Sequence, residues 1–101
     1  MFDRRTSFRK PIRMFFNKYL DGYPHLCRSV DLSESGLLAV SYSEPEGAME
    51  SFPISLRLPG DPSPVWVWAR GVWRKDRTQA IEFVSTAPDD AHRLERFLAV
   101  A

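Results

Sequence analysis

Two arginines four residues apart stand near the start of the chain, in the stretch RRTSFRKP at positions 4–11. The pair is Arg5 and Arg9, and Arg4 directly precedes it. A guanidinium group presents a planar fork of donors, which fits a phosphate or the N7 and O6 acceptors of guanine with two charge-assisted hydrogen bonds. This spacing therefore indicates a site for an anionic ligand, although alone it is also typical of a solvated basic tail.

A second polar group follows about twenty residues later, in DLSESG at positions 31–36. The Asp31 carboxylate can accept hydrogen bonds from guanine N1–H and its amino group, and the Ser33 hydroxyl can donate or accept. At positions i and i+2 of a strand end, both point to the same side of the sheet. Gly36 offers a sharp reversal that lets a flat base lie against the backbone. By itself the stretch is equally an ordinary strand-to-turn sequence.

Positive charge is concentrated at the N-terminus. Residues 1–18 contain six lysines and arginines and one aspartate, a local charge of +5, whereas the whole chain carries +1. The remaining residues, at −4, offer no extended basic groove for nucleic acid. Asp31 is expected to face the positive segment and to hold the site together before a ligand binds. With 44% apolar and 27% charged residues, the composition is that of one soluble globular domain with no membrane span.

Motifs for catalysis and metal binding are absent from the sequence. No Gly-rich phosphate loop, H-E-x-x-H or G-x-S-x-G occurs, so we expect no enzyme. His25 and Cys27 form an H-x-C pair, but no second pair completes a four-coordinate site, which predicts no metal and no cofactor. The expected arrangement is a buried free thiol beside an exposed histidine. One cysteine and no apolar signal segment after the first methionine predict a cytoplasmic protein.

Apolar patterning predicts six strands and one helix. The helix, over residues 88–99, begins with Pro88 and repeats apolar side chains at helical spacing. In the first strand apolar residues occupy both faces, so we expect it to be covered on both sides. Pro53 places its strand at an edge, or with its N–H side outward. The predicted strands cover residues 12–20, 26–32, 36–42, 52–58, 65–75 and 79–85.

Three tryptophans lie on the fifth predicted strand. Trp66 and Trp68 share one face, and Trp73 follows further along. Any of them could stack on a base, since aromatic faces accept purines. The favoured interpretation is structural, because strand tryptophans usually fill a barrel core or contact a helix.

The two polar motifs and the strand pattern together resemble the PilZ family. Its hallmark is R-x-x-x-R before the first barrel strand and D-x-S-x-x-G at a strand end some twenty residues later. The resemblance covers essentially the whole chain, including the GVW and IEF strands. It implies a flexible basic segment over residues 1–10, then a six-stranded antiparallel β-barrel with a C-terminal helix over residues 11–101. One departure is Ala80, where many members have glycine, which affects affinity rather than fold.

Family members of this type bind cyclic di-GMP, so the resemblance implies a receptor for this second messenger. Ligand binding is expected to order residues 1–10 over the barrel and to signal to a separate protein, often one in motility or polysaccharide export. An arginine before the motif tends to accompany an intercalated ligand pair, and a ligand-mediated dimer stays open. The implied ligand-binding residues are Arg5, Arg9, Asp31, Ser33 and Gly36, with Arg4 and Trp73 as further candidates.

Two alternatives remain open from the sequence. One is a PilZ-fold protein-interaction module with weak or no nucleotide binding. The other is a small barrel that binds single-stranded nucleic acid through the basic segment and the tryptophans.

Overall fold

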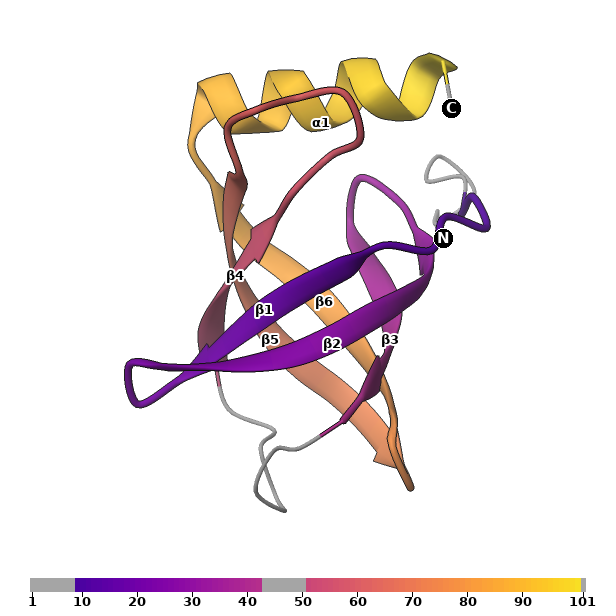
Figure 1. Cartoon of the computed structure of the whole chain (residues 1–101), viewed down its shortest axis with the longest axis vertical. Coiled ribbons are helices and arrows are strands. Elements are labelled where there is room, and N and C mark those ends of the chain that lie inside the picture. Colours follow the sequence, from indigo (N-terminus) through magenta and orange to yellow (C-terminus); the bar gives the residue numbers. More distant parts are fainter. Residues whose placement is uncertain (1–8, 43–50, 101) are drawn as a thin grey trace, which may run out of the picture.

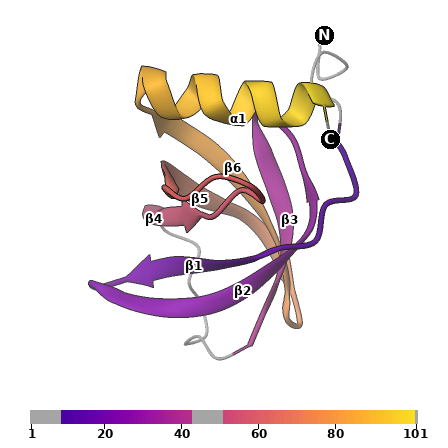
Figure 2. The same cartoon turned by 45° about the horizontal axis from the view of Figure 1, so that its top comes forward.

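Six antiparallel strands form a closed barrel, and one helix lies across one of its openings (Figures 1 and 2). The computed structural model describes residues 9–42 and 51–100. Around the barrel the strands follow the order β1-β2-β3-β6-β5-β4, which confirms the predicted fold class. The elements are β1 (Phe15–Leu20), β2 (Tyr23–Leu32), β3 (Gly36–Ser41), β4 (Ser51–Leu56), β5 (Val65–Lys75), β6 (Thr78–Thr86) and α1 (Pro88–Val100).

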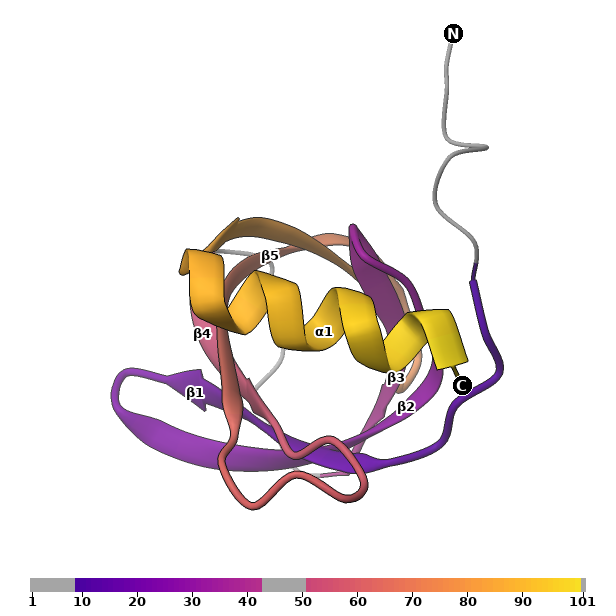
Figure 3. The same ribbon diagram turned by 90° about the horizontal axis from the view of Figure 1, so that it is seen from above.

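Inward-facing side chains alternate along the strands and form one core. The predicted buried face of the fourth strand is confirmed, since none of its four apolar residues is more than 2% exposed. Seen from above, α1 crosses the mouth of the barrel (Figure 3). It buries Leu94 and Leu98 and packs Phe97 against the same core. No helix in the described ranges is both long and apolar enough to cross a bilayer. The four buried apolar residues of the predicted fourth strand are Phe52, Ile54, Leu56 and Leu58.

The tryptophans of β5 lie on the outer surface, so their interpretation as core side chains is wrong. Trp66, Trp68 and Trp73 are 45%, 46% and 47% exposed. The opposite face of β5 points inward, and the interior of a small barrel is just wide enough for its inward side chains to fill. Three indoles would overfill that space. The inward residues are the smaller Val65, Val67 and Ala69.

The first strand is shorter than predicted and is not covered on both sides. It begins at Phe15, and the residues just before it are held to β2 by both the side chain and the backbone N–H of Ser29. Ser29 Oγ donates to the Ile12 carbonyl at 2.6 Å and accepts from the Met14 N–H at 3.0 Å. Phe15 itself is 59% exposed.

The second strand begins three residues earlier than predicted, at Tyr23. The turn before it consists only of Asp21 and Gly22, with φ of 53° and 84°. Two successive residues with positive φ make the tight turn that joins antiparallel strands directly. On the same strand Cys27 is buried as predicted, whereas His25 is half-buried rather than exposed because strand alternation turns it to the same inner side.

Closure of the barrel decides the placement of Pro53. Its strand β4 pairs with both β1 and β5, so an edge position is excluded. The pairing with β1 runs only from Leu56 to Ile54. Pro53 lies just beyond this ladder, where its missing N–H removes no bond to β1.

Candidate ligand site at the barrel rim

An ion pair joins the two sequence motifs at one end of β2. The Arg9 Nη1 donates to Asp31 Oδ1 at 2.8 Å, across 22 residues of chain. The two side chains are 52% and 22% exposed, so solvent and a ligand can reach the pair. The expectation that the aspartate faces the basic segment is met at Arg9. Arg4 and Arg5 lie outside the described residues.

Backbone contacts place Arg9 beside Asp31. Lys10 and Leu32 form an isolated antiparallel bridge, in which each N–H donates to the other carbonyl at 2.9 Å. Figure 2 shows the segment that follows, in indigo, leading from the helix end of the barrel into β1. The fully buried Ser29 holds this segment, since its N–H donates to the Met14 carbonyl at 2.9 Å in addition to its two hydroxyl bonds. Ser29 was not identified from the sequence. It could have been found because it is a polar residue at a strand position that alternation turns toward the interior.

Asp31 is oriented by the strand next to it. A β-bulge between Ser29 and Asp31 interrupts the pairing of β2 with β3. At this point Asp31 Oδ1 accepts the Leu38 N–H at 3.1 Å as well as the Arg9 guanidinium. Within the described ranges Oδ2 has no hydrogen-bond partner. One oxygen thus anchors the carboxylate, and the other keeps its acceptor capacity for a ligand.

Ser33 belongs to the turn between β2 and β3. Its strand ends at Leu32, so the argument that Asp31 and Ser33 share one face of a strand does not apply. The buried hydroxyl donates to the Gly36 carbonyl at 3.1 Å and accepts from the Ser35 N–H at 3.2 Å. In this geometry Ser33 fixes the shape of the turn.

Gly36 allows β3 and β6 to approach closely. A Cβ at this position would lie 2.2 Å from the Ile81 carbonyl oxygen, which no side chain can do. Its φ lies outside the left-handed region, so the sharp reversal expected from the sequence is not the reason for the glycine. A backbone bond from Phe83 N–H to the Ser35 carbonyl, at 2.8 Å, continues this contact.

Strand register aligns Asp31 with Trp73 in one row across the barrel wall. Asp31 pairs with Leu38, Leu38 with Ala80, and Ala80 with Trp73. Three strand spacings separate the two ends of this row, about 14 Å in total. Trp73 follows a second bulge, after Gly71. The carboxylate of Asp31 and the half-exposed indole of Trp73 therefore stand at the two ends of this row, with the small side chain of Ala80 between them.

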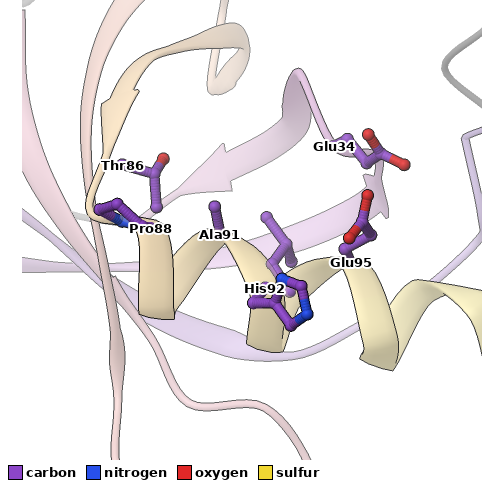
Figure 4. Close-up of a pocket in the computed structure, with 7 residues that line it drawn as sticks. Glu34, Thr86, Pro88, Ala91, His92 and Glu95 are labelled. Carbon is purple, nitrogen blue, oxygen red and sulfur yellow. The ribbon is translucent and has the colours of Figure 1, made fainter.

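A cleft between α1 and the β2–β3 turn adjoins this rim but has the wrong charge for an anion. Glu34 of the turn and Glu95 of α1 both line it, with His92 on the same helix (Figure 4). Two carboxylates repel a phosphate, so an anionic ligand is favoured on the side of Arg9 instead.

Comparison with known proteins gives a family and a fold. The sequence model of the PilZ domain matches residues 3–100. Among solved structures, the Inhibitor of motility (MotI/DgrA) of Bacillus subtilis is similar, with a TM-score of 0.73 and 17% sequence identity over 98% of this chain and 51% of that one. At this identity the similarity shows the fold, and the chain spans about half the length of that structure. No curated protein matches.

Proposed function

This chain belongs to the PilZ domain family, and from that membership we propose that it is a non-catalytic receptor for cyclic di-GMP which signals to a separate protein. The family is one of cyclic di-GMP-binding adaptors. The observation that carries the proposal is the exposed Arg9–Asp31 pair, which joins the two halves of the family's binding motif at 2.8 Å.

Each motif residue has a role that fits its chemistry. Arg9 and Arg5 bind the phosphates or the N7 and O6 edge of guanine. Asp31 accepts from guanine N1–H and the amino group, an arrangement that adenine cannot satisfy. Ser33 and Gly36 hold the turn that follows the strand carrying this carboxylate. Arg4 and the half-exposed Trp73 are further contacts, the latter for stacking.

Ligand binding exchanges one partner of Arg9 for another. Without ligand, Asp31 neutralises the guanidinium and holds it at the rim. A phosphate competes for the same donors, while the Leu38 N–H keeps Asp31 in place to meet a guanine. In this proposal the ligand orders residues 1–10 over the barrel, and the surface so formed is what the partner protein reads.

A second candidate function is a protein-interaction module in which nucleotide binding is weak or absent. The large apolar side chains exposed on the barrel wall favour it, since contiguous patches of this kind mark interaction sites.

Calorimetric titration of cyclic di-GMP tests the proposal. We expect saturable binding to the wild type, no comparable binding of GTP, and a loss of about two to four decades in affinity for Arg5→Ala/Arg9→Ala, at about 1.5 to 3 kcal/mol for each charged hydrogen-bond group. Arg96→Ala, an exposed arginine of α1, is the matched control and should bind as the wild type does. Absence of binding to a folded wild type would leave the interaction module.

A further inference from the structure

A groove on the outer wall of the barrel, across β2, β1, β4 and the start of β5, is lined mainly by apolar and aromatic side chains. We name it the aromatic groove. Phe15, Leu26 and Trp66 in its lining are 59%, 45% and 45% exposed, which is unusual for side chains of this size. Its lining comprises these three with Phe16, Asn17, Tyr19, Ser55, Arg57 and Pro64.

The walls of the aromatic groove are held in place by the rest of the fold. The rings of Tyr19 and Trp66 contact each other, with centroids 5.3 Å apart. The backbone N–H of Trp66 donates to Asp90 Oδ2 of α1 at 3.2 Å, and the Pro64 carbonyl accepts from Arg93 Nη1 at 3.3 Å. A rigid aromatic wall loses little conformational entropy when a partner binds.

Charge on the strands around the aromatic groove is mainly positive, and the neighbouring Asp90 of α1 is paired with Arg93. Strands β1, β2, β4 and β5 contain a single carboxylate, Asp31, which is paired with Arg9. Of the residues that line the aromatic groove, Arg57 alone is charged, and it is exposed. An occupant of complementary chemistry therefore presents apolar side chains together with a carboxylate.

We propose that the aromatic groove binds a segment of the partner protein in which aromatic or aliphatic side chains stand next to an aspartate or glutamate. The inference rests on the proposed function for the partner's role. Single-stranded nucleic acid fits less well, because a phosphate backbone is matched by several cations along a groove and this lining offers one.

The aromatic groove is connected to the ligand site through a short stretch of chain. Phe15 directly follows residues 9–14, which run from the Arg9–Asp31 pair and are fixed to β2 by Ser29. A ligand that displaces Arg9 from Asp31 acts on the same stretch. The position of Phe15, and with it the affinity for the partner segment, can thus respond to the ligand.

Peptide selection on the full chain tests the proposal. A random-sequence phage library is selected against the wild type, and an enriched peptide is synthesised and titrated by fluorescence anisotropy. We expect enriched peptides to combine aromatic or aliphatic residues with an adjacent acid. Trp66→Ser should weaken their binding by at least about tenfold, as is usual for an aromatic hot spot. Val84→Ser, a 53% exposed residue on β6, is the matched control and should not.

A charge reversal adds a signature that misfolding cannot produce. Arg57→Glu should lower the affinity for the enriched peptide. It should raise the affinity, relative to the wild type, for a version of the peptide in which lysine replaces the acidic residue. The proposal is overturned if no peptide is enriched or if Trp66→Ser leaves the affinity for the peptide unchanged. It is also overturned if a thymidine oligonucleotide binds the groove more tightly than the peptide. Sedimentation that shows a dimer lost in Trp66→Ser assigns the groove to a second copy and also overturns it.

Titration of cyclic di-GMP into the same variants separates the two proposals. Trp66→Ser is expected to keep the wild-type affinity for the nucleotide. If the wild type binds the nucleotide but no acidic peptide, the groove proposal alone fails. If the wild type binds the peptide through Trp66 but not the nucleotide, the receptor proposal alone fails.

Discussion

Lys18 places an ammonium group inside the barrel. It is fully buried, its Nζ donates to Gln79 Oε1 at 2.6 Å, and it lies 4.6 Å from the centroid of the Phe52 ring. The amide oxygen and the aromatic face replace water around the charge. Lys18 shares a face of the predicted first strand with Met14 and Phe16 at a spacing of two residues, so its inward position could be predicted from the sequence.

Removing the acceptor of this buried cation should cost more than removing both partners. We expect Gln79→Leu to lower the free energy of unfolding by about 2 to 4 kcal/mol, because the Lys18 ammonium loses the Gln79 amide oxygen as an acceptor. Lys18→Met/Gln79→Leu should return to within about 1 kcal/mol of the wild type, since two apolar side chains then fill the space. Urea denaturation measures both. A double variant no more stable than Gln79→Leu would contradict this account.

Gly36→Ala is the second test at the residue scale. The added methyl group meets the Ile81 carbonyl, and backbone of two paired strands must separate to admit it. We expect a loss of about 1 to 3 kcal/mol, typical of overpacking, seen as a lower midpoint in thermal unfolding. Ser35→Ala, an exposed change in the same turn, serves as the control and should stay within about 0.5 kcal/mol of the wild type.

Arg93 ties helix α1 to the loop between β4 and β5. Its guanidinium donates to the Asp61 and Asp90 carboxylates at 3.0 and 2.9 Å, and to the Pro64 and Ser63 carbonyls. The Ser63 N–H bond and then the Arg93 bond lower the pKa of the Asp61 carboxyl, and the bond to Asp61 raises the pKa of Arg93. The element that covers the barrel is thus fixed by polar contacts as well as by its apolar face.

These contacts predict how stability depends on pH. The pKa of Asp61 is lower in the folded chain than in the unfolded one, so its contribution is complete above the unfolded value, near pH 4, and is lost as the pH falls through the folded value. The difference in unfolding free energy between wild type and Asp61→Asn should therefore be present at pH 6 and shrink toward pH 2.

Denaturation across this pH range checks the expectation. Asp76→Asn is the matched control, because asparagine tolerates the positive φ of 56° at that turn equally well. A difference that stays constant with pH in Asp61→Asn, or that shrinks equally in Asp76→Asn, would count against the Arg93 network as its source.

On the scale of the whole molecule, folding and ligand capture use different parts of the chain. Within residues 9–42 and 51–100, the buried core residues lie between Met14 and Leu98, whereas Arg4 and Arg5 of the proposed ligand site precede this span in the sequence. Barrel closure and the covering helix are therefore expected to form without the first residues of the chain, and the nucleotide is expected to require them.

Deleting residues 1–8 tests this separation. The midpoint of thermal unfolding should stay within about 3 °C of the wild type. Affinity for cyclic di-GMP should fall by at least about tenfold, since the contacts of Arg5 are lost. Arg4→Ala/Arg5→Ala in the full-length chain should match the deletion in calorimetry. Should the deletion unfold the barrel, the division between core and ligand clamp would be wrong.

Much of the fold was predictable because it follows from short-range geometry. Alternation along a strand fixed which side chains of the fourth strand are buried, and helical spacing placed α1 to within one residue of its observed end. The same reasoning could not decide which face of the fifth strand points inward. Both faces are apolar, and the volume available inside a six-stranded barrel, not hydrophobicity, put the three tryptophans outside.

The candidate site divides in the same way. The sequence alone supplied residue types suited to an anionic nucleotide and a spacing that resembles the PilZ motif. Only the tertiary structure brought Arg9 to Asp31, because that contact depends on the Lys10–Leu32 bridge, the Ser29 side chain and a bulge in β2. The aromatic groove likewise exists only after β1 closes against β4, since contacts between distant segments arise from closure of the barrel and leave no local pattern in the chain.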